Sequence, residues 1–262
     1  MIRSPLITVM VQAVRKAGRT LARDFGEVEQ LQVSMKGPGD FVSAADRKAE
    51  DTLFAELSRA RPNYGFLMEE RGAVEGTDPA NTWVVDPLDG TTNFLHGIPI
   101  FSISLALVRN GVPVAGVVYN PVSDELYVAE SGQGAYLNER RIRVAARRKL
   151  AECVVCCGVP HMGRGDHAQF NRELELVQPQ VSGIRRTGSA AIDLAWTAAG
   201  RFDAFWERNL SPWDMAAGIV LVREAGGYVS DMDDGEKMLE RGHIMAGNEL
   251  IRRDLQKLLK KA

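Results

Sequence analysis

Apolar residues recur at helical spacing in two stretches near the start of the chain, over 5–25 and 44–59. They fall at Ile7, Val11, Val14, Leu21, Phe25 and at Ala49, Leu53, Phe54, Leu57. Steps of three, four or seven residues place side chains on one face of a helix. The pattern therefore predicts two amphipathic helices, each with one face in the core.

The middle of the chain changes to the pattern of strands. A long apolar run covers 98–108, and Asn110-Gly111 then indicates a hairpin. Further short apolar segments, separated by turn residues, cover 112–119, 125–129, 131–137 and 142–144. Strands at such regular spacing are typical of an antiparallel sheet, so we expect a meander after the two helices.

Strand-like and helix-like segments alternate in the second half. Strands are predicted over 153–159, 184–187, 202–206 and 243–246, and helices over 167–177, 190–199, 214–225 and 248–259. Leu250, Ile251, Leu255 and Leu258 are expected to point inward from the last helix. This alternation predicts an α/β arrangement in which helices cover a sheet.

Composition and charge exclude several classes of function. The 32 Lys and Arg residues nearly balance 34 Asp and Glu, so the net charge of −2 gives no general attraction for nucleic acid or anionic membrane. A basic run covers 140–149, and we interpret it as a solvated edge. A patch for a partner protein or RNA is the alternative, although no aromatic residue within the run supports base stacking. The sequence therefore does not predict nucleic acid as a partner.

Targeting signals and cysteines point to the cytoplasm. The start of the chain does not read as a secretory signal, and no run of about 18 apolar residues predicts a membrane span. Cys153, Cys156 and Cys157 form an odd cluster rather than a disulfide framework. They suit a buried strand better than a zinc site, which needs four ligands. The four histidines show no ligand spacing and are interpreted as ordinary packing or surface residues.

The most informative stretch reads WVVDPLDGTTNF, over 83–94. Three strand-forming residues end at Asp86, where Pro87 is expected to stop the strand because it lacks an N–H. Asp89 and Gly90 follow, and Thr91 then begins a helical turn. Backbone N–H groups at such a turn can bind a phosphate, and two carboxylates beside it can hold a hard cation. Each Asp dipeptide alone would indicate a plain turn, but together they predict a metal–phosphate site.

Three other segments offer groups for the same chemistry. Glu69 follows a short apolar segment, although paired glutamates are usually solvated. Asp214, in the segment SPWDMAAG, could equally cap the helix that follows it. Lys36 lies in a Lys-Gly-Pro-Gly-Asp segment, which is either a surface loop or a loop that opens and closes over a site. In the second case Lys36 could reach a phosphate or a metal-bound water.

These motifs resemble those of the inositol monophosphatase family, a group of magnesium-dependent, lithium-sensitive phosphatases. The resemblance rests on the tryptophan-led strand with Asp-Pro-Leu-Asp-Gly-Thr-Thr-Asn-Phe and on Trp-Asp-Met-Ala-Ala-Gly, and it covers nearly the whole chain. Met68 replaces a family glycine, and the Lys36 loop is one residue shorter than the family pattern. The resemblance implies a layered αβαβα sandwich of the sugar-phosphatase type, which usually forms a homodimer. We treat 1–262 as one domain, with a metal and phosphate half over 1–145 and a substrate half over 146–262.

Residue roles follow from the resemblance alone. It implies that two or three Mg²⁺ ions are held by Glu69, Asp86, Asp89, Asp214 and the main-chain carbonyl of Leu88. It implies catalytic roles for Glu69, Thr91, Asp89 and Lys36, with Thr91 holding the attacking water. It places the phosphate on the amides of Gly90, Thr91 and Thr92. The alcohol half of the substrate would meet Gly188, Ser189, Ala190, Glu207, Asp89 and Asp214.

The function implied by the resemblance is hydrolysis of a small phosphorylated polyol or sugar, with inositol 1-phosphate as the preferred candidate. Fructose-1,6-bisphosphatase and histidinol-phosphate phosphatase share the metal core and stay open as alternatives. A 3′-phosphoadenosine-5′-phosphate phosphatase is disfavoured, because such enzymes have Thr-Lys-Glu where this chain has Thr91-Thr92-Asn93. A regulatory role in partner binding, beside weak phosphatase activity, is the alternative of a different class.

Overall fold

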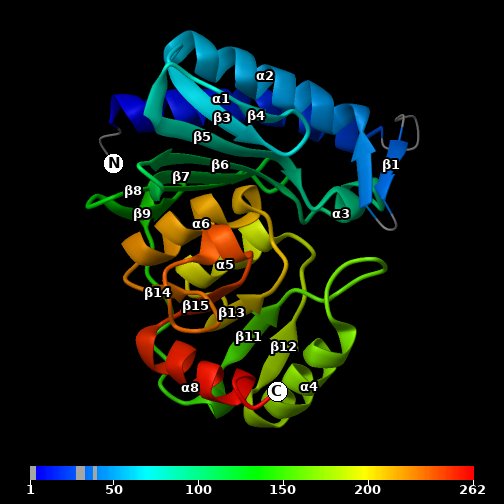
Figure 1. The fold of residues 1–262 in the computed structure, drawn as a ribbon, viewed down its shortest axis with the longest axis vertical. Coiled ribbons are helices and arrows are strands. Elements are labelled where there is room, and N and C mark those ends of the chain that lie inside the picture. The colour runs from blue at the N-terminus through cyan, green and yellow to red at the C-terminus, as the bar shows by residue number, and fades with distance from the viewer. Residues whose placement is uncertain (1–3, 28–32, 38–39) are drawn as a thin grey trace.

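The computed structural model describes residues 4–27, 33–37 and 40–262, with the backbone alone at 33–37 and 40–42. Within these residues, helices and sheets stack in five layers (Figure 1). The outer and middle helical layers are α1 (Pro5–Phe25) with α2 (Ala44–Ala60), α5 (Ala190–Ala198) with α6 (Pro212–Glu224), and α4 (His167–Val177) with α8 (Glu249–Leu259). The predicted α/β class and the αβαβα layering are confirmed.

The first sheet lies beneath α1 and α2 and has eight strands in the described part of the chain. Its order is β10-β9-β8-β7-β6-β5-β3-β4, and only β3 and β5 are parallel neighbours. The strands are β3 (Tyr64–Met68), β4 (Gly72–Val74), β5 (Asp78–Asp89), β6 (Ser102–Arg109), β7 (Val112–Asn120), β8 (Glu125–Glu130), β9 (Gly134–Leu137) and β10 (Arg140–Arg141). The predicted meander is therefore correct in outline.

Both faces of this sheet are buried. Trp83 and Val85 point into the core under α1 and α2, whereas Val84 points into the core shared with α5 and α6. Successive residues of a strand face opposite sides, so a strand between two helical layers must be apolar throughout. This is why the middle of β5, at Trp83, Val84 and Val85, and the middle of β6, from Leu105 to Val108, are apolar at successive positions.

The second sheet has the order β12-β11-β13-β15-β14 among the described residues. Its strands are β11 (Val154–Cys157), β12 (Gly183–Arg185), β13 (Ala204–Glu207), β14 (Tyr228–Ser230) and β15 (Ile244–Gly247). Helix α6 lies between the two sheets and has buried residues on every face, from Met215 to Val222. Gly116 lets α6 approach β7, because a Cβ there would lie 2.5 Å from the carbonyl oxygen of Ala217. The boundary at residue 145 between the two halves stays a prediction.

Short elements complete the fold. They are β1 (Val33–Gly37) and β2 (Asp40–Ser43), which pair with each other, the helical turns α3 (Thr91–Leu95) and α7 (Met238–Arg241), and 3₁₀ turns over Leu150–Glu152 and Gln178–Gln180. Lys36 lies in β1 rather than in a free loop. Its side chain and residues 38–39 lie outside the described part, so the predicted opening and closing of this segment stays a prediction.

Two predicted strand boundaries were wrong around Pro87 and Pro99. Strand β5 continues through Pro87 to Asp89, because β3 ends opposite Val85 and no neighbour needs the missing N–H. The pairing of β5 with β6 shifts register between Asp86 and Asp89. Strand β6 begins only at Ser102, since the preceding residues form a turn in which the Ile98 amide donates to the Asn93 carbonyl.

Two predictions near the helical layers were also wrong. The last strand of the meander is β10, at Arg140–Arg141, rather than 142–144. The Ile142 amide still donates to the Ala135 carbonyl of β9, but the Val144 amide donates to Ala225 at the end of α6. Leu250 does not point inward: it is 41% exposed, whereas Ile251 and Leu255 are buried. Its position in the first turn of α8 turns it away from the second sheet.

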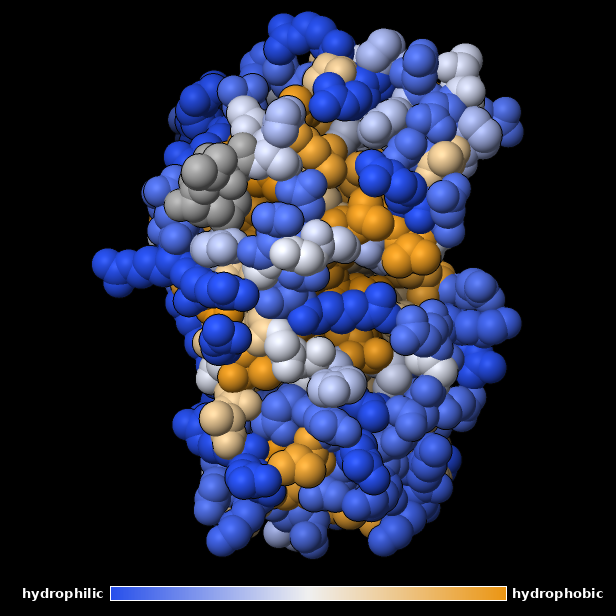
Figure 2. Space-filling model, turned by 90° about the vertical axis from the view of Figure 1, so that its left-hand side faces the viewer, coloured by the Kyte–Doolittle hydropathy of each residue, from blue (hydrophilic) through white to orange (hydrophobic). Residues whose placement is uncertain are grey.

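The surface is mostly polar at both ends of the molecule. On the face shown in Figure 2, apolar residues gather at mid-height, at the level of the first sheet and α6 in Figure 1. Across the described residues, no helix is both long and apolar enough to cross a membrane.

Candidate active site

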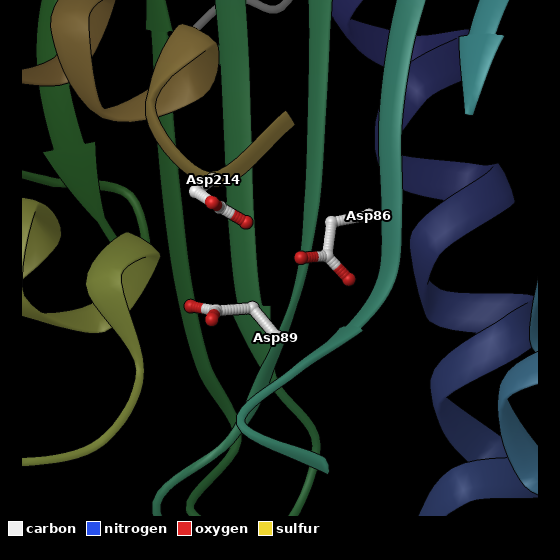
Figure 3. Close-up of side chains that lie close together, drawn as sticks. All are labelled: Asp86, Asp89 and Asp214. Atoms are coloured by element: carbon white, nitrogen blue, oxygen red, sulfur yellow. The ribbon is translucent and has the colours of Figure 1, made fainter. Parts of the chain in front are cut away.

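Three carboxylates from distant parts of the chain converge at one end of the first sheet. Asp86 and Asp89 belong to β5, and Asp214 belongs to the first turn of α6; their side chains point toward one another (Figure 3). One oxygen of each lies within 4.8 Å of those of the other two. The structure thus brings together the three aspartates that the sequence motifs predicted as metal ligands.

The irregular end of β5 aims both of its aspartates at the same point. An oxygen of Asp86 accepts a hydrogen bond from the Leu88 amide at 2.9 Å, which fixes the carboxylate across the register shift. Gly90 follows with φ of 96°, a left-handed conformation that glycine adopts without strain. The chain can therefore turn sharply from β5 into α3.

Asp214 is held by the capping of α6. Its Oδ2 accepts a hydrogen bond from the Ser211 amide at 2.7 Å, in a reciprocal capping box. The start of α6 is in turn fixed to the first sheet, because the Ser104 hydroxyl on β6 donates to the Trp213 carbonyl at 2.9 Å. Ser104 is the partner of Asp86 in the pairing of β5 with β6. The hydrogen bond from Ser104 to Trp213 therefore places Asp214 beside Asp86.

Burial and mutual repulsion destabilise the charged forms of these carboxylates. Burial is the largest cause that raises the pKa of Asp86 well above its ordinary value, followed by the charges of Glu69, Asp89 and Asp214. Burial also raises the pKa of Asp89 and Asp214, although hydrogen bonds to Asp89 and Asp214 oppose it. A cation placed among them would relieve both penalties.

Glu69 directly follows β3 and lines the same cleft. It is not part of the group of carboxylates whose oxygens lie within 4.8 Å of one another. Its amide donates to the Val85 carbonyl, and its carboxylate hydrogen-bonds with Asp86. The turn after it is fixed by Glu50 of α2, a buried side chain that accepts hydrogen bonds from the amides of Glu70 at 2.9 Å and Arg71 at 3.3 Å. The predicted ligand is therefore near the aspartates and held from two sides.

Asp46 is a residue that sequence reasoning missed. It is completely buried on α2, where its Oδ2 accepts hydrogen bonds from the amide and the hydroxyl of Ser43. Its Oδ1 lies 3.1 Å from the hydroxyl of Thr91, which also lies 3.0 Å from the Leu88 carbonyl. The apolar periodicity placed Asp46 on the polar face of the helix. The signal that could have found it is Ser43 three residues earlier, the sequence mark of a capping box.

Asn93, also assigned no role from sequence, connects the turn that begins at Gly90 to the second half of the chain. Its side-chain amide donates to the Ile100 carbonyl at 2.7 Å and to the Thr187 carbonyl at 2.8 Å. Gly188 follows with φ of 92°, and a Cβ there would lie 2.9 Å from the Asn93 amide nitrogen. Glycine is thus required for this close approach.

The segment after Gly188 contacts the aspartates directly. The Ser189 hydroxyl and the Ala191 amide donate to the same oxygen of Asp89, at 2.5 and 2.7 Å. Ser189 also caps α5, as predicted, by accepting from the Ile192 amide. Ala190 lies between these donors and lines the cleft.

Glu207 ends β13 and points into the cleft from the second sheet. Gly158 makes room for it, because a Cβ there would lie 1.8 Å from the Glu207 Cδ. Burial is the largest cause that raises its pKa well above the ordinary value, and the charges of Asp193, Asp214 and Asp89 add to it. The carboxyl group of Glu207 can therefore hold a proton, and then both donate and accept a hydrogen bond.

One cleft of about 830 Å³ lies between the two halves of the chain and is lined by the three aspartates, Glu69, Asn93, Ala190 and Glu207. It also contains the predicted residues Leu88, Gly90, Thr91, Thr92, Gly188 and Ser189. Such a volume fits a substrate the size of a sugar phosphate. Among the predicted site residues, only the side chain of Lys36 lies outside the described part.

Comparisons with known proteins extend over the whole chain. A profile of the "Inositol monophosphatase family" matches residues 2–262. The chain is 66% identical over 261 residues to the inositol-1-monophosphatase of Mesorhizobium japonicum, covering 100% of this chain and 98% of the relative. It is 42% identical to the Nus factor SuhB of Pseudomonas aeruginosa, covering 93% and 92%. The crystal structure of the extragenic suppressor protein suhB from Bartonella henselae superposes with a TM-score of 0.96 at 57% identity, covering 99% and 100%.

Proposed function

This chain belongs to the inositol monophosphatase family, as its motifs predict, and we propose that it hydrolyses inositol 1-phosphate to inositol and phosphate with the help of Mg²⁺. The observation that supports this most is the convergence of three aspartates within 4.8 Å, next to a glycine turn that can bind a phosphate. Relatives at 56–66% identity carry the name inositol-1-monophosphatase.

The donor set fits a hard divalent cation. Buried carboxylates that repel one another need positive charge between them, and carboxylate and carbonyl oxygens favour Mg²⁺ over softer metals. The proposed ligands are Glu69, Asp86, Asp89, Asp214 and the main-chain oxygen of Leu88. Two or three ions agree with this number of donors. When bound, such ions make water more acidic and neutralise charge on a phosphate.

Thr91 orients the attacking water in this proposal. Its hydroxyl proton points to the Asp46 carboxylate or the Leu88 carbonyl, which both lie within hydrogen-bond distance. A lone pair of the Thr91 oxygen then faces the cleft and accepts a hydrogen bond from the water, which keeps its proton until Glu69 takes it. Glu69, at the edge of the aspartates, is the proposed final acceptor of that proton, and Asp89 helps to orient the reacting groups.

Backbone and side-chain groups of both halves position the substrate. The amides of Gly90, Thr91 and Thr92 lie in the first turn of α3, where N–H groups have no partner within the helix, and they would bind phosphate oxygens. Glu207 would accept hydrogen bonds from ring hydroxyls. The other proposed contacts of the ring are Asp89, Gly188, Ser189, Ala190 and Asp214. The catalytic role of Lys36 stays a prediction.

Phosphate release from purified protein tests the proposal. The protein is first treated with a chelator and then assayed with inositol 1-phosphate, fructose 1,6-bisphosphate, histidinol phosphate and 3′-phosphoadenosine 5′-phosphate. We expect release from inositol 1-phosphate only after Mg²⁺ is restored, and inhibition by Li⁺. Absence of release from every ester, with Mg²⁺ or Mn²⁺, would contradict the proposed function. Preference for another ester would change the substrate and keep the reaction class.

The finer expectations of assembly and location also belong to this proposal. We expect a homodimer, as in the family that the sequence resembles, and a cytoplasmic protein. Light scattering coupled to gel filtration measures the molar mass directly. A mass near 28.8 kDa would correspond to a single chain and contradict the dimer.

A further inference from the structure

Glu50 is a buried carboxylate that lies outside the proposed set of metal ligands. It belongs to α2, is 3% exposed and does not line the cleft. Its Oε2 accepts hydrogen bonds from two consecutive amides, those of Glu70 at 2.9 Å and Arg71 at 3.3 Å. Burying a carboxylate is costly unless such contacts compensate. The contacts of Glu50 are made to one place, the backbone directly after Glu69.

This backbone forms the tight turn between β3 and β4. Met68 at the end of β3 pairs with Gly72 at the start of β4, so the chain reverses within residues 69–71. The first residue of the turn is fixed to the sheet, because the Glu69 amide donates to a carbonyl of β5. The other two amides donate to Glu50. The direction of the turn thus depends on a contact between the first sheet and the helical layer that covers it.

Arg71 covers the other oxygen of Glu50. Its guanidinium lies 4.4 Å from the centre of the Phe54 ring, and its Nε lies 3.7 Å from Oε1 of Glu50. Burial raises the pKa of Glu50, whereas the two amides and the charge of Arg71 oppose that rise. Nη2 of Arg71 also pairs with Asp51 at 2.5 Å, but Asp51 is 70% exposed and such surface pairs contribute little. Each oxygen of Glu50 therefore has its own partner, Oε2 the turn and Oε1 the guanidinium.

Glu69 depends on this turn more than the aspartates do. Asp86 and Asp89 belong to β5, and Asp214 is held in the first turn of α6. Glu69 instead directly follows β3 and lies outside the group whose oxygens are within 4.8 Å of one another. It reaches the cleft from the turn that Glu50 fixes. A shift of the turn would therefore move Glu69 and leave the three aspartates in place.

Resting on the proposed function, we propose that Glu50 is a positioning residue for Glu69. By holding the amides of the turn, Glu50 sets the affinity of the divalent cation that Glu69 binds, and it does not affect a cation held by the aspartates alone. Groups that orient a metal ligand change the affinity by about 10- to 100-fold when they are removed. The competing explanation is that Glu50 only stabilises the fold, in which case its loss would weaken the binding of every cation alike.

Calorimetric titration with Mn²⁺ tests this role without any phosphate ester. Mn²⁺ prefers the same oxygen ligands as Mg²⁺. The protein is first freed of metal with a chelator. Titration of the Glu69→Gln protein then shows which binding step depends on Glu69. The same titration is made with the unaltered protein and with two variants, Glu50→Asp and Glu50→Gln.

The two variants separate the position of the acceptor from its charge. Glu50→Asp keeps the charge beside Arg71 but withdraws the oxygens from the turn by the length of one methylene group. We expect it to weaken the Glu69-dependent step by about tenfold or more. Glu50→Gln removes the charge but keeps one carbonyl oxygen, which can accept from both amides as Oε2 does. We expect this variant to bind Mn²⁺ as the unaltered protein does.

Asp51→Asn is the matched control, because it removes the neighbouring carboxylate of α2, whose pair with Arg71 lies at the surface. It should change no binding step. The positioning role is overturned if Glu50→Asp leaves the Glu69-dependent step unchanged or weakens every step alike. It is also overturned if Glu50→Gln weakens that step as much as Glu50→Asp, or if no step depends on Glu69.

The titration separates this inference from the proposed function. Binding of Mn²⁺ that is weakened selectively in Glu50→Asp supports the positioning role even if no phosphate ester is hydrolysed. Hydrolysis of inositol 1-phosphate by a protein whose Glu50→Asp variant binds every cation normally overturns the positioning role and keeps the proposed function. Absence of any binding of Mn²⁺ or Mg²⁺ by the unaltered protein contradicts both.

Discussion

The hydroxyl of Thr91 lies 3.1 Å from Oδ1 of Asp46, a carboxylate that is completely buried on a different element. Burial raises the pKa of Asp46, while hydrogen bonds from Ser43 and Thr91 oppose that rise. A hydroxyl that donates to a carboxylate accepts a stronger hydrogen bond from a neighbouring water. In the proposed mechanism, Asp46 thus positions Thr91 to face the attacking water.

The first prediction concerns Asp46→Asn. The single amide oxygen can still accept from Ser43. The NH₂ group that replaces the other oxygen cannot accept from the Thr91 hydroxyl, so the orientation of Thr91 is lost. We expect kcat for inositol 1-phosphate to fall by about a hundredfold, within the range typical of positioned proton-transfer groups, with little change in KM. The control is Asp51→Asn, on the exposed face of the same helix. A kcat within twofold of the unaltered protein would rule out this role.

The fold could be predicted from sequence wherever burial is periodic. The helices over Pro5–Phe25 and Ala44–Ala60 follow from apolar steps of three and four. The end of β5 could not be predicted in this way. Whether Pro87 interrupts the strand depends on whether a neighbouring strand would need a hydrogen bond from residue 87, which proline cannot donate. That neighbour is β3, whose last residue lies opposite Val85 by a pairing that no local pattern encodes.

The same distinction between local patterns and long-range contacts applies to the candidate site. The aspartates of the two long motifs could be predicted because each motif joins a strand or helix end to acidic residues. Their convergence depends on the Ser104 hydrogen bond to α6, which crosses from the first sheet to the middle layer. Asp46 and Asn93 were missed because their partners, Thr91 and Thr187, are distant in sequence. Long-range hydrogen bonds of single polar residues leave no periodic signal.

The second prediction concerns Asp86→Asn, both its activity with Mg²⁺ and its stability without metal. The variant keeps an oxygen for the Leu88 amide and removes one of the clustered charges. We expect hydrolysis to fall by more than about a thousandfold, because a proposed metal ligand is lost. The metal-free fold should gain about 1 kcal/mol, since a buried, repelled charge is removed.

Thermal unfolding in a chelator measures this gain, and a stopped phosphate assay with Mg²⁺ measures the loss. Asp254→Asn, on the exposed side of α8, is the matched control and should change neither quantity. Near-normal turnover of Asp86→Asn would refute the ligand assignment. A lower melting temperature would refute the argument that the clustered charges oppose folding.

The third prediction is that the stability of the metal-free protein falls as pH rises from 5 to 8. Burial raises the pKa of Asp193 and Asp214 to about 7 from an ordinary value of 3.8. Between these values the folded protein holds more protons than the unfolded chain, so each rise in pH favours unfolding. The loss should be complete once the pH exceeds the folded-state value of about 7.

Urea unfolding at pH 5, 6, 7 and 8 in a chelator gives the free energy of unfolding. Added Mg²⁺ should flatten the profile, because a cation stabilises the deprotonated aspartates. Asp193→Asn should flatten only part of it, since Asp193 lies outside the proposed ligand set and an amide oxygen can still accept from Thr187. Stability that rises across this range without metal would show that these carboxylates are not destabilised by burial.

The fourth prediction concerns Gly158→Ala, which tests the placement of Glu207. A Cβ at residue 158 would lie 1.8 Å from the Glu207 Cδ, so the carboxylate must leave its position at the ring end of the cleft. We expect KM for inositol 1-phosphate to rise by about tenfold, as loss of a charged hydrogen bond does, while kcat changes less. Gly26→Ala, after α1, is the control because its φ of −72° suits alanine and its nearest neighbour would lie 3.4 Å away. An unchanged KM in Gly158→Ala would mean that Glu207 does not hold the ring of the substrate.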